Sequence, residues 1–331
     1  MDSFAGKLAV VTGGGSGMGR ELVRQLAAEG CSVAACDWNP DSLASGTTAA
    51  RNGAPSGVLV TSHVCDVSDE AQVLRFRDEM LQQHSAEHVD LVFSNAGVGG
   101  GASFVRDSRE HWERTFAVDW WGVYHCARVF LPLLIASGDG VLVNTSSVDG
   151  FWATGGPGAP NTAYATAKFA VKGFTEALIE DLRSNAPQVR VAVVMPGHVG
   201  TEILANSRRA LGLPEPDAMT QAQLEEWIPA SVRSGLVRAG LLPENSSVDD
   251  LRLLLARLET DFRDKARVTA AEAATIILDG VRSGAWRILV GRDAGLIDAA
   301  VRAAPESAYD YPALFQDVRA RATRAAAEKD R

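Results

Sequence analysis

The sequence has few cysteines, no long hydrophobic run and a deficit of positive charge. Four cysteines occur among 331 residues, and they form no CxxC pair and no cysteine–histidine cluster with zinc spacing. No stretch approaches the roughly 20 apolar residues that a membrane span needs. The first residues lack the basic region and the apolar run of a signal peptide. We therefore expect a cytoplasmic protein that holds no metal and enters no membrane.

The charge balance is acidic, with 32 Lys and Arg against 41 Asp and Glu and a formal net charge of -9. Nucleic acids and anionic membranes attract clustered positive charge, so neither is an expected partner. The composition, 46% hydrophobic and 22% charged, is typical of a soluble globular protein. The length suits one large domain or two smaller ones.

Short apolar runs alternate with longer amphipathic patterns up to residue 201. Near-continuous apolar runs indicate strands buried on both faces, as in a parallel sheet covered by helices. The expected strands are 7–12, 32–37, 57–62, 90–94, 140–145 and 189–195, and the expected helices are 18–29, one starting at 68–70, 109–134 and 162–183. This alternation predicts a doubly wound α/β fold of the Rossmann type.

The pattern changes between residues 202 and 267, where no strand is indicated. An amphipathic helix is expected at 251–262. The segment is otherwise divided into short helical pieces by Pro214, Pro216, Pro229 and Pro243.

A helix over 270–282 and a strand over 286–290 then resume the earlier pattern. We therefore expect a single domain, 1–331, with a helical insertion at 202–267 after the sixth strand. Residues 305–331 should form a helical tail that frays from Arg319 onward, because its Ala- and Arg-rich sequence has little to bury.

A glycine-rich turn, from Thr12 to Gly19, lies between the first expected strand and the first expected helix. Glycine permits positive φ angles and a close approach of ligand to backbone. The helix N-terminus adds unpaired N–H groups and the positive end of its dipole, which suit a pyrophosphate. A flexible turn without a ligand is the alternative, but the position between strand and helix favours dinucleotide binding.

Asp37 ends the second expected strand, about twenty residues beyond this turn, where an acid binds the adenosine ribose hydroxyls. Its charge would also repel a 2′-phosphate. Trp38 and Asn39 follow it, where Arg or Lys would indicate NADP. NAD is therefore favoured over NADP. Asp37 could instead, or in addition, cap a helix that begins near Pro40.

Tyr164 and Lys168 are four residues apart, so they lie on one face if the segment is helical. A free tyrosine titrates at about 10, and a neighbouring cation lowers that pKa. The pair is thus a candidate for proton transfer. The same spacing also occurs on many solvated helix faces.

Together these features resemble the short-chain dehydrogenase/reductase family over residues 5–201 and again near 270–291. The glycine turn matches that family's cofactor turn, and the Tyr–Lys spacing matches its YxxxK pair. The other matching positions are Asp66, Asn95-Ala96-Gly97, Ser147 in Asn144-Thr145-Ser146-Ser147, and Pro196-Gly197 with Thr201.

The resemblance implies a nicotinamide cofactor. Asp66 would contact the adenine ring, and the segment from Pro196 to Thr201 would surround the nicotinamide. The implied cofactor-binding residues are Gly13, Ser16, Gly17, Met18, Gly19, Asp37, Asp66, Val67, Asn95, Ala96, Gly97, Tyr164, Lys168, Pro196, Gly197, Val199 and Thr201.

The implied reaction is hydride transfer between a secondary alcohol or ketone and the nicotinamide. Tyr164 would be the acid/base, Lys168 would lower its pKa and bind the nicotinamide ribose, and Ser147 would orient the substrate oxygen. Ser146 is a rival for the serine role, and a turn-capping serine is the alternative reading of Ser147. Such positioned proton transfer typically contributes about 10²–10⁴ in rate.

The chain departs from the family pattern in three places. Asp119 stands where the family usually has Asn, and its charge beside Lys168 should alter proton release. The interval from Ser147 to Tyr164 is long, and the 202–267 insertion is much longer than in compact members.

The insertion is rich in apolar side chains, and Phe151 and Trp152 add to them just beyond Ser147. A bulky apolar or aromatic substrate under a mobile lid is the hypothesis. Packing of these side chains on the body or on another subunit is the alternative. The apolar residues of the insertion are Ile203, Leu204, Leu211, Leu213, Trp227, Ile228, Leu236, Val237, Leu241 and Leu242.

Several residues near the implied site are assigned plainer roles. His198 should be a wall of the site rather than a catalyst, and the Arg208-Arg209 pair should be a solvated helix face. Trp120 and Trp121 should pack on the long helix, which in this family commonly pairs with its copy in a homodimer or homotetramer.

Two other functions remain open. One is a catalytically silent dinucleotide-binding regulatory protein, although such proteins typically lack the Tyr or the Lys. The other is epimerase or dehydratase chemistry, which is usual in longer relatives.

Overall fold

The computed structural model describes residues 1–228, 230–238 and 240–329. Pro229 and residue 239 of the expected insertion lie outside the described residues, as do residues 330–331 of the expected tail. Within this range, no helix has the length and apolar character needed to cross a bilayer.

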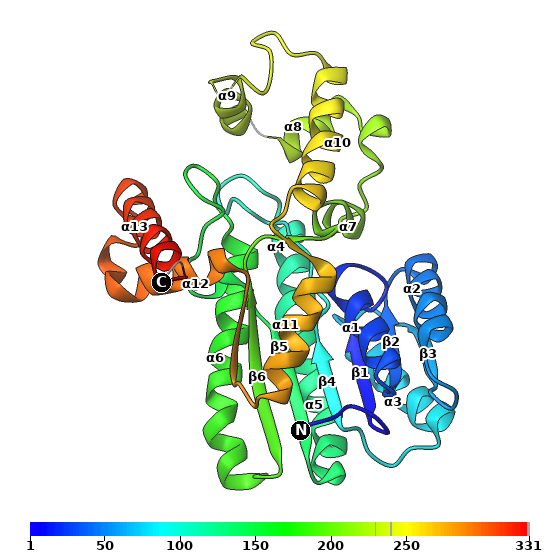
Figure 1. Ribbon diagram of the computed structural model, residues 1–331. Helices are drawn as coiled ribbons and strands as arrows, with labels where there is room; N and C mark the ends of the chain where they lie inside the picture. Colours follow the sequence, from blue (N-terminus) through cyan, green and yellow to red (C-terminus); the bar gives the residue numbers. More distant parts are fainter. Residues whose placement is uncertain (229, 239, 330–331) are drawn as a thin grey trace.

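A seven-stranded parallel sheet forms the centre of the described chain, in the order β3-β2-β1-β4-β5-β6-β9 (Figure 1). The order reverses between β1 and β4, so a crevice is expected at the carboxyl ends of these strands. The predicted doubly wound α/β fold is confirmed. The strands are β1 Leu8–Thr12, β2 Ser32–Asp37, β3 Val60–Val64, β4 Leu91–Ser94, β5 Gly140–Thr145, β6 Val189–Pro196 and β9 Arg287–Val290.

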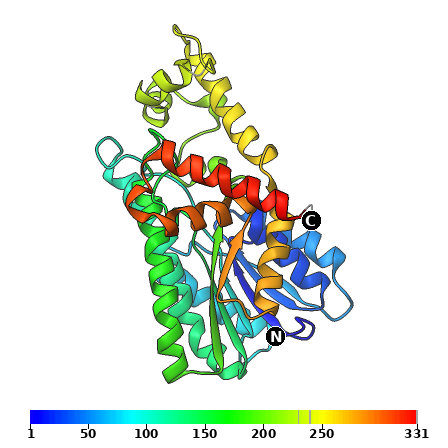
Figure 2. The ribbon, with the colours of Figure 1, turned by 60° about the vertical axis from the view of Figure 1, so that its left-hand side comes forward.

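Helices cover both faces of the sheet, which is why the strands are apolar on both sides (Figure 2). Leu22 and Ile277 belong to the buried cluster on one face, and Phe76 and Phe130 to the cluster on the other. The helices on the first face are α1 Gly17–Ala28, α2 Pro40–Gly53 and α11 Ala270–Arg282. Those on the second face are α3 Glu70–His84, α5 Gly122–Ser137 and α6 Thr162–Asn185.

Two expected elements differ from the observed ones. The third strand begins at Val60 rather than 57, because Gly57 has a φ of +89° and precedes the pairing with β2, and it extends to Val64 opposite Asp37. The helix expected over 109–134 is divided into α4 (Arg109–Phe116), one π-helical turn (Ala117–Trp121) and α5. Such a turn often marks a functional site within a helix.

In the described residues of the expected insertion at 202–267, all regular secondary structure is helical, and turns or irregular segments join the helices. The insertion lies between two short strands that pair with each other, β7 (Val199–Gly200) and β8 (Val268–Thr269). Figure 1 shows most of the segment standing above the sheet. Its elements are α7 Ile203–Ala210, a 3₁₀ turn Pro216–Ala218, α8 Gln221–Trp227, α9 Ala230–Arg238 and α10 Val248–Asp264.

The 202–267 segment has a hydrophobic cluster of its own. The cluster is built around the buried Met219, Leu224, Leu251 and Leu255. The apolar residues expected to cover a substrate, or to pack on the body or on another subunit, therefore pack largely on each other. Those in this cluster are Leu213, Trp227, Ile228, Leu236, Val237 and Leu242.

The C-terminal part is helical, as expected, with α12 (Arg292–Ala303), a 3₁₀ turn (Pro305–Ser307) and α13 (Tyr311–Lys329). The expectation of fraying from Arg319 is wrong, because α13 continues to Lys329. Arg292 Nη2 donates to the carbonyl of Ala322 at 2.7 Å and so ties this end to α12.

Candidate active site

A cleft opens at the carboxyl ends of β1, β2 and β4, where the strand order reverses. Its walls contain most of the residues that the resemblance assigned to a dinucleotide. The expected residues that line it are Gly13, Ser16, Gly17, Met18, Asp37, Asp66, Val67, Asn95, Ala96, Gly97 and Thr201.

The glycine turn leaves no room for side chains. Gly13 has a φ of +67°, and a Cβ there would lie 2.9 Å from the Cα of Ala96. A Cβ on Gly19 would lie 2.1 Å from the carbonyl oxygen of Gly13. The turn therefore brings bare backbone to the N-terminus of α1, as a pyrophosphate site needs.

Asp37 is held by the turn itself. Its Oδ2 accepts a hydrogen bond from the N–H of Gly15 and its Oδ1 from the N–H of Asn39, both at 3.0 Å. Burial raises the pKa of this carboxyl, and these N–H groups partly oppose the rise. The alternative role as a helix cap is wrong, because Asn39 caps α2 through hydrogen bonds from Asp41 and Ser42.

Arg114, which sequence reasoning missed, also lines the cleft. Its guanidinium lies 2.8 Å from Asp66 Oδ2 and donates to Ser68 Oγ at 2.7 Å. The Asp66 carboxylate is thereby fixed, and its pKa is lowered by hydrogen bonds from Ser68 and Arg114 despite burial. No local signal marks Arg114, because it comes from α4, far along the chain from Asp66.

The segment after β4 is anchored to the end of β1. The N–H groups of Asn95 and Ala96 donate to Thr12 Oγ1 at 3.0 and 3.1 Å, and Asn95 Nδ2 donates to the Thr12 carbonyl at 3.1 Å. Gly97, the next residue, is the point where the cleft meets the implied catalytic residues. A Cβ there would lie 2.9 Å from Asp119 Oδ1 and 3.2 Å from Lys168 Nζ.

The structure brings Ser147, Tyr164 and Lys168 together. Lys168 Nζ lies 5.3 Å from the centroid of the Tyr164 ring and donates to the carbonyl of Thr145 at 3.1 Å. The Ser147 hydroxyl is near enough to Tyr164 to lower the pKa of the phenol. It also accepts from the N–H of Asp149 at 3.1 Å, so its expected capping role holds as well. The rival Ser146 donates to the carbonyl of Lys168 at 2.7 Å.

The pKa of Tyr164 is raised, which is opposite to the lowering that the sequence predicted from Lys168. Burial is the main cause, and the carboxylates of Asp119 and Asp149 add to it, while the nearby Ser147 hydroxyl lowers the value. The charge of Lys168 is countered by Asp119, whose Oδ1 lies 3.7 Å from Nζ. The site therefore holds a protonated phenol.

Asp119 occupies the π-helical turn and is fully buried. Its Oδ1 accepts from the N–H of Val98 at 2.9 Å, whereas Oδ2 finds no hydrogen-bond partner in the described chain. Burial raises its pKa to about 6, although Lys168 lowers it. A buried carboxyl with a free oxygen and a raised pKa is a common feature of functional sites.

Asp149 is a second buried acid that sequence reasoning did not identify. Its Oδ2 accepts from Asn161 Nδ2 at 2.6 Å, and burial raises its pKa to about 6. Only its place two residues after Ser147 could have pointed to it.

The segment from Pro196 to Thr201, which the resemblance assigned to the nicotinamide, contacts the carboxylate of Asp293. A Cβ on Gly197 would lie 2.2 Å from the Asp293 carboxylate, which also accepts from the N–H of His198 at 2.8 Å. The His198 ring is hydrogen-bonded to the carbonyl of Phe262 at 2.8 Å and packs on the Phe262 ring. Pro196 and Gly197 lie at the end of β6, and Val199 is buried.

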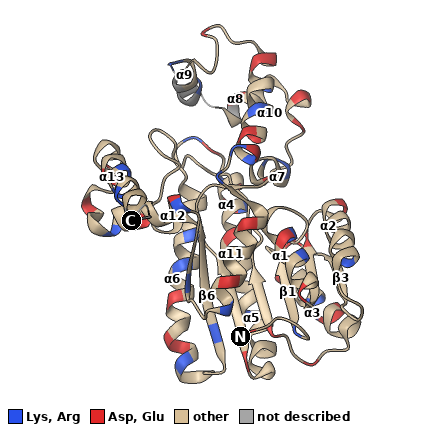
Figure 3. Cartoon of the chain, viewed as in Figure 1, with Lys and Arg blue, Asp and Glu red and all other residues tan. Residues whose placement is uncertain are grey.

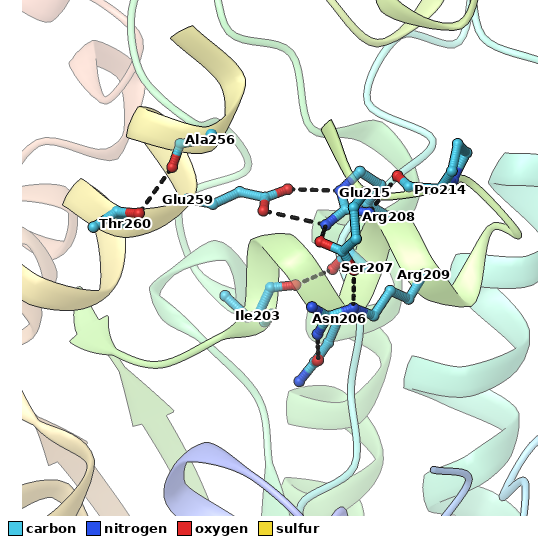
Figure 4. A network of polar contacts seen from close by, with 10 residues as sticks. All are labelled: Ile203, Asn206, Ser207, Arg208, Arg209, Pro214, Glu215, Ala256, Glu259 and Thr260. Carbon is cyan, nitrogen blue, oxygen red and sulfur yellow. Dashed lines mark hydrogen bonds and ion pairs between the residues drawn. The ribbon is translucent and has the colours of Figure 1, made fainter. Parts of the chain in front are cut away.

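Two expectations about the surroundings are wrong. Arg208 is not on a solvated helix face, because its side chain is fully buried and paired with Glu215 and Glu259 (Figure 4). Trp152 does not face a substrate, because its indole N–H donates to the Ala308 carbonyl at 2.8 Å and its ring packs on the C-terminal helices. Glu259 and Ala308, the partners that overturn these expectations, come from distant parts of the chain.

Comparisons with known proteins agree with this geometry. The short chain dehydrogenase family matches residues 7–212. The SadH protein of Mycobacterium tuberculosis is 33% identical over 302 residues, which cover 91% of this chain and 92% of that protein. Levodione reductase of Leifsonia aquatica is 30% identical over 247 residues, covering 74% and 86% of the two chains.

The fold has solved relatives as well. A short-chain dehydrogenase/reductase from Burkholderia phymatum, crystallised with NAD, aligns with a TM-score of 0.71 and 28% identity over 93% of this chain and 95% of that one. The chain belongs to the short-chain dehydrogenase/reductase family of NAD(P)-binding Rossmann oxidoreductases.

Proposed function

We propose that the chain is an NAD-dependent alcohol dehydrogenase or carbonyl reductase that transfers hydride between nicotinamide and a secondary alcohol or ketone. One observation carries the proposal. Lys168 lies beside Gly97, which lines the same cleft as the glycine turn, and Tyr164 and Ser147 lie next to Lys168. A dinucleotide lying along the cleft would direct its reactive ring toward the phenol.

The chain's own residues would move the proton. The bound cofactor would supply or accept the hydride. In reduction, the protonated Tyr164 would donate its phenolic hydrogen to the ketone oxygen, and Ser147 would hydrogen-bond the same oxygen. Lys168 would hold the ribose, and its positive charge would stabilise the phenolate that forms.

Asp37 supports NAD as the preferred cofactor. Its carboxylate lines the cleft and is aligned by the N–H of Gly15. A 2′-phosphate at this end of the cleft would meet like charge, and Arg114, the cation of the cleft wall, is already paired with Asp66.

Apolar residues of the 202–267 segment that lie outside its own cluster support a bulky apolar substrate. We propose that the 202–267 segment is a substrate lid within a single domain, 1–331, followed by the helical tail 305–331. Ile203 lines the cleft, and the Leu211 side chain approaches Gly100 on the loop after β4. These side chains face the body, whereas most of the other apolar residues form the segment's own cluster.

The test is turnover read as NADH absorbance at 340 nm over a panel of ketones and secondary alcohols. We expect bulky apolar compounds to be better substrates than small polar ones, and NADH to be preferred to NADPH. Tyr164→Phe should lower turnover about 10²–10⁴-fold while NADH still binds. Binding of NADH without turnover on any compound would instead favour a silent regulatory protein.

We further propose a cytoplasmic homodimer or homotetramer. The four cysteines are free and buried, which suits a reducing compartment. Trp121 is 44% exposed beside Tyr124 on the long helix, where a second copy could cover it. Helix α6 carries both charge signs along its length rather than a basic stripe (Figure 3).

A further inference from the structure

Helix α7 forms part of the cofactor cleft. Ile203, Asn206 and Ala210 line the cleft from this helix. Asn206 Nδ2 donates to Ser16 Oγ in the glycine turn at 3.0 Å, and Ser207 Oγ accepts from the N–H of Gly99 at 2.6 Å. One side of α7 is therefore bonded to the loops that would enclose a dinucleotide.

The other side of α7 holds the rest of the 202–267 segment through Arg208. Its Nε donates to Glu259 Oε1 on α10 at 2.8 Å, and its Nη2 donates to Glu215 Oε2 at 2.7 Å (Figure 4). Nη1 donates to the carbonyl of Pro214. The guanidinium thus bridges α7, the turn after it and the long helix α10, and it does so without exposure to solvent.

These contacts join the glycine turn to α10 in one continuous chain. Asn206 Oδ1 accepts from Arg209 Nη1 at 3.2 Å, and Arg209 Nε donates to Glu215 Oε1 at 2.8 Å. Each polar group is therefore bonded to the next. The sequence of contacts runs Ser16, Asn206, Arg209, Glu215, Arg208, Glu259.

This series of polar contacts, from Ser16 to Glu259, has the properties of a rigid connection. A guanidinium presents its donors in a fixed plane, so two carboxylates and a carbonyl bound to it hold one relative orientation. Burial of the Arg208 side chain makes its contacts costly to break singly, whereas the two contacts of Arg209 are exposed. The side chains of the 202–267 segment pack in a hydrophobic cluster of their own, so the segment can change its orientation as one unit. The contacts at its base then set that orientation.

We propose that Arg208 is a positioning residue that makes the orientation of the 202–267 segment depend on the dinucleotide. The inference rests on the proposed cofactor site and deepens it. Both Ser16 and Asn206 line the cleft, so a ligand that fixes their side chains also fixes the hydrogen bond between them. Arg208 does not line the cleft, but its contact with Glu259 would then hold α10 in one orientation.

The test is hydrogen–deuterium exchange of the whole protein with and without NAD. In the native protein, we expect NAD to slow exchange in the glycine turn, in α7 and in α10. The slowing in α10 should be about fivefold or more, the lower end of typical coupling between two sites. In Arg208→Met, NAD should still bind, with a Kd within about threefold of native and with protection of the glycine turn, while the protection of α10 is lost.

Two further variants separate positioning from a general loss of structure. Arg252→Met is the matched control, because Arg252 donates to the Met219 carbonyl and to Asp249 within the same segment, and it should keep the NAD response of α10. Glu259→Gln keeps the shape of the Arg208 partner and should reduce that response even if Arg208→Met does not fold.

Each outcome has a distinct meaning. Equal NAD protection of α10 in native, Arg208→Met and Glu259→Gln proteins would overturn the positioning role, as would NAD binding that leaves α10 unprotected in the native protein. If the native protein binds neither NAD nor NADP, the proposed function fails and this inference fails with it.

Discussion

Two buried cations, Lys168 at the catalytic site and Arg208 in the 202–267 segment, are paired with carboxylates in different ways. Around Arg208, the guanidinium donates to two carboxylates and a carbonyl, and its pKa is raised while that of Glu215 is lowered. Around Lys168, the nearest carboxylate stands 3.7 Å away, one of its oxygens has no partner among the described residues, and its pKa is raised to about 6.

The difference shows where chemistry can occur. A fully paired buried charge is stable in one protonation state, so it holds structure. An incompletely paired one changes its protonation near neutral pH, so it can respond to a substrate or a cofactor. The Arg208 guanidinium belongs to the first kind, and the Asp119 carboxyl belongs to the second.

The largest expected effect tests whether the 202–267 segment is stabilised separately from the sheet. Leu255 is 3% exposed in the segment's own cluster. Leu255→Ala should lower local stability by about 2–5 kcal/mol through cavity formation. Hydrogen exchange should accelerate in α8 and α10 while the strands of the sheet keep their protection. Leu253→Ala, at a position 71% exposed on the same helix, is the control. Equal acceleration throughout the sheet would show that the two regions unfold together.

Asp119→Asn tests the cost of the incompletely paired charge. The pKa of Asp119 is about 6 in the folded protein against 3.8 for a free aspartate. The folded state therefore binds more protons between these values, and native stability falls as pH rises from 3.8 to about 6. The variant lacks this loss, so above pH 6 it should gain up to about 3 kcal/mol relative to the native protein. Urea unfolding at pH 4 and pH 7 measures the change, and a pH-independent difference would contradict it.

Gly97→Ala probes the junction of cleft and catalytic residues. The added methyl group would lie 2.9 Å from Asp119 Oδ1 and 3.2 Å from Lys168 Nζ. Displacement of these groups should lower kcat about 10²-fold, as small misplacements in active sites do. Gly173→Ala on α6 has open space among the described atoms and should leave kcat unchanged. Full activity in Gly97→Ala would place the reaction elsewhere.

The smallest expected effect concerns cofactor choice. Asp37→Asn removes the charge but keeps an oxygen acceptor for only one of the N–H groups of Gly15 and Asn39, which donate to different oxygens. The ratio of NAD to NADP affinity should fall about tenfold, which corresponds to about 1.4 kcal/mol. Titration of each nucleotide measures it, and an unchanged ratio would remove Asp37 from the discrimination.

The parts of the site built from local backbone were predictable from sequence. The glycine turn follows a buried strand and opens a helix, so its position and its crowded geometry follow from a short stretch of residues. Tyr164 and Lys168 needed only helical spacing. The sheet followed from apolar runs that are buried on both faces.

The remaining parts depend on contacts between distant residues. Arg208 looked solvated because Glu259 is far along the chain, and Arg114 gave no sign that it would fix Asp66. The pKa of Tyr164 was predicted in the wrong direction because burial and Asp149 were not visible in the Tyr–Lys spacing. The packing of the 202–267 segment on itself was likewise not predictable, because a sequence does not show which other residues an apolar side chain will contact.

Turnover at saturating NADH in Lys168→Met and Arg208→Met tests the central contrast most directly. We expect Lys168→Met to lose about 10²-fold or more in kcat, because the group beside the phenol is gone. Arg208→Met should keep kcat within about tenfold and raise KM for the ketone instead, because the lid is misplaced while the chemistry is intact. An equal loss of kcat in both variants would contradict the division between a reacting cluster and a structural one.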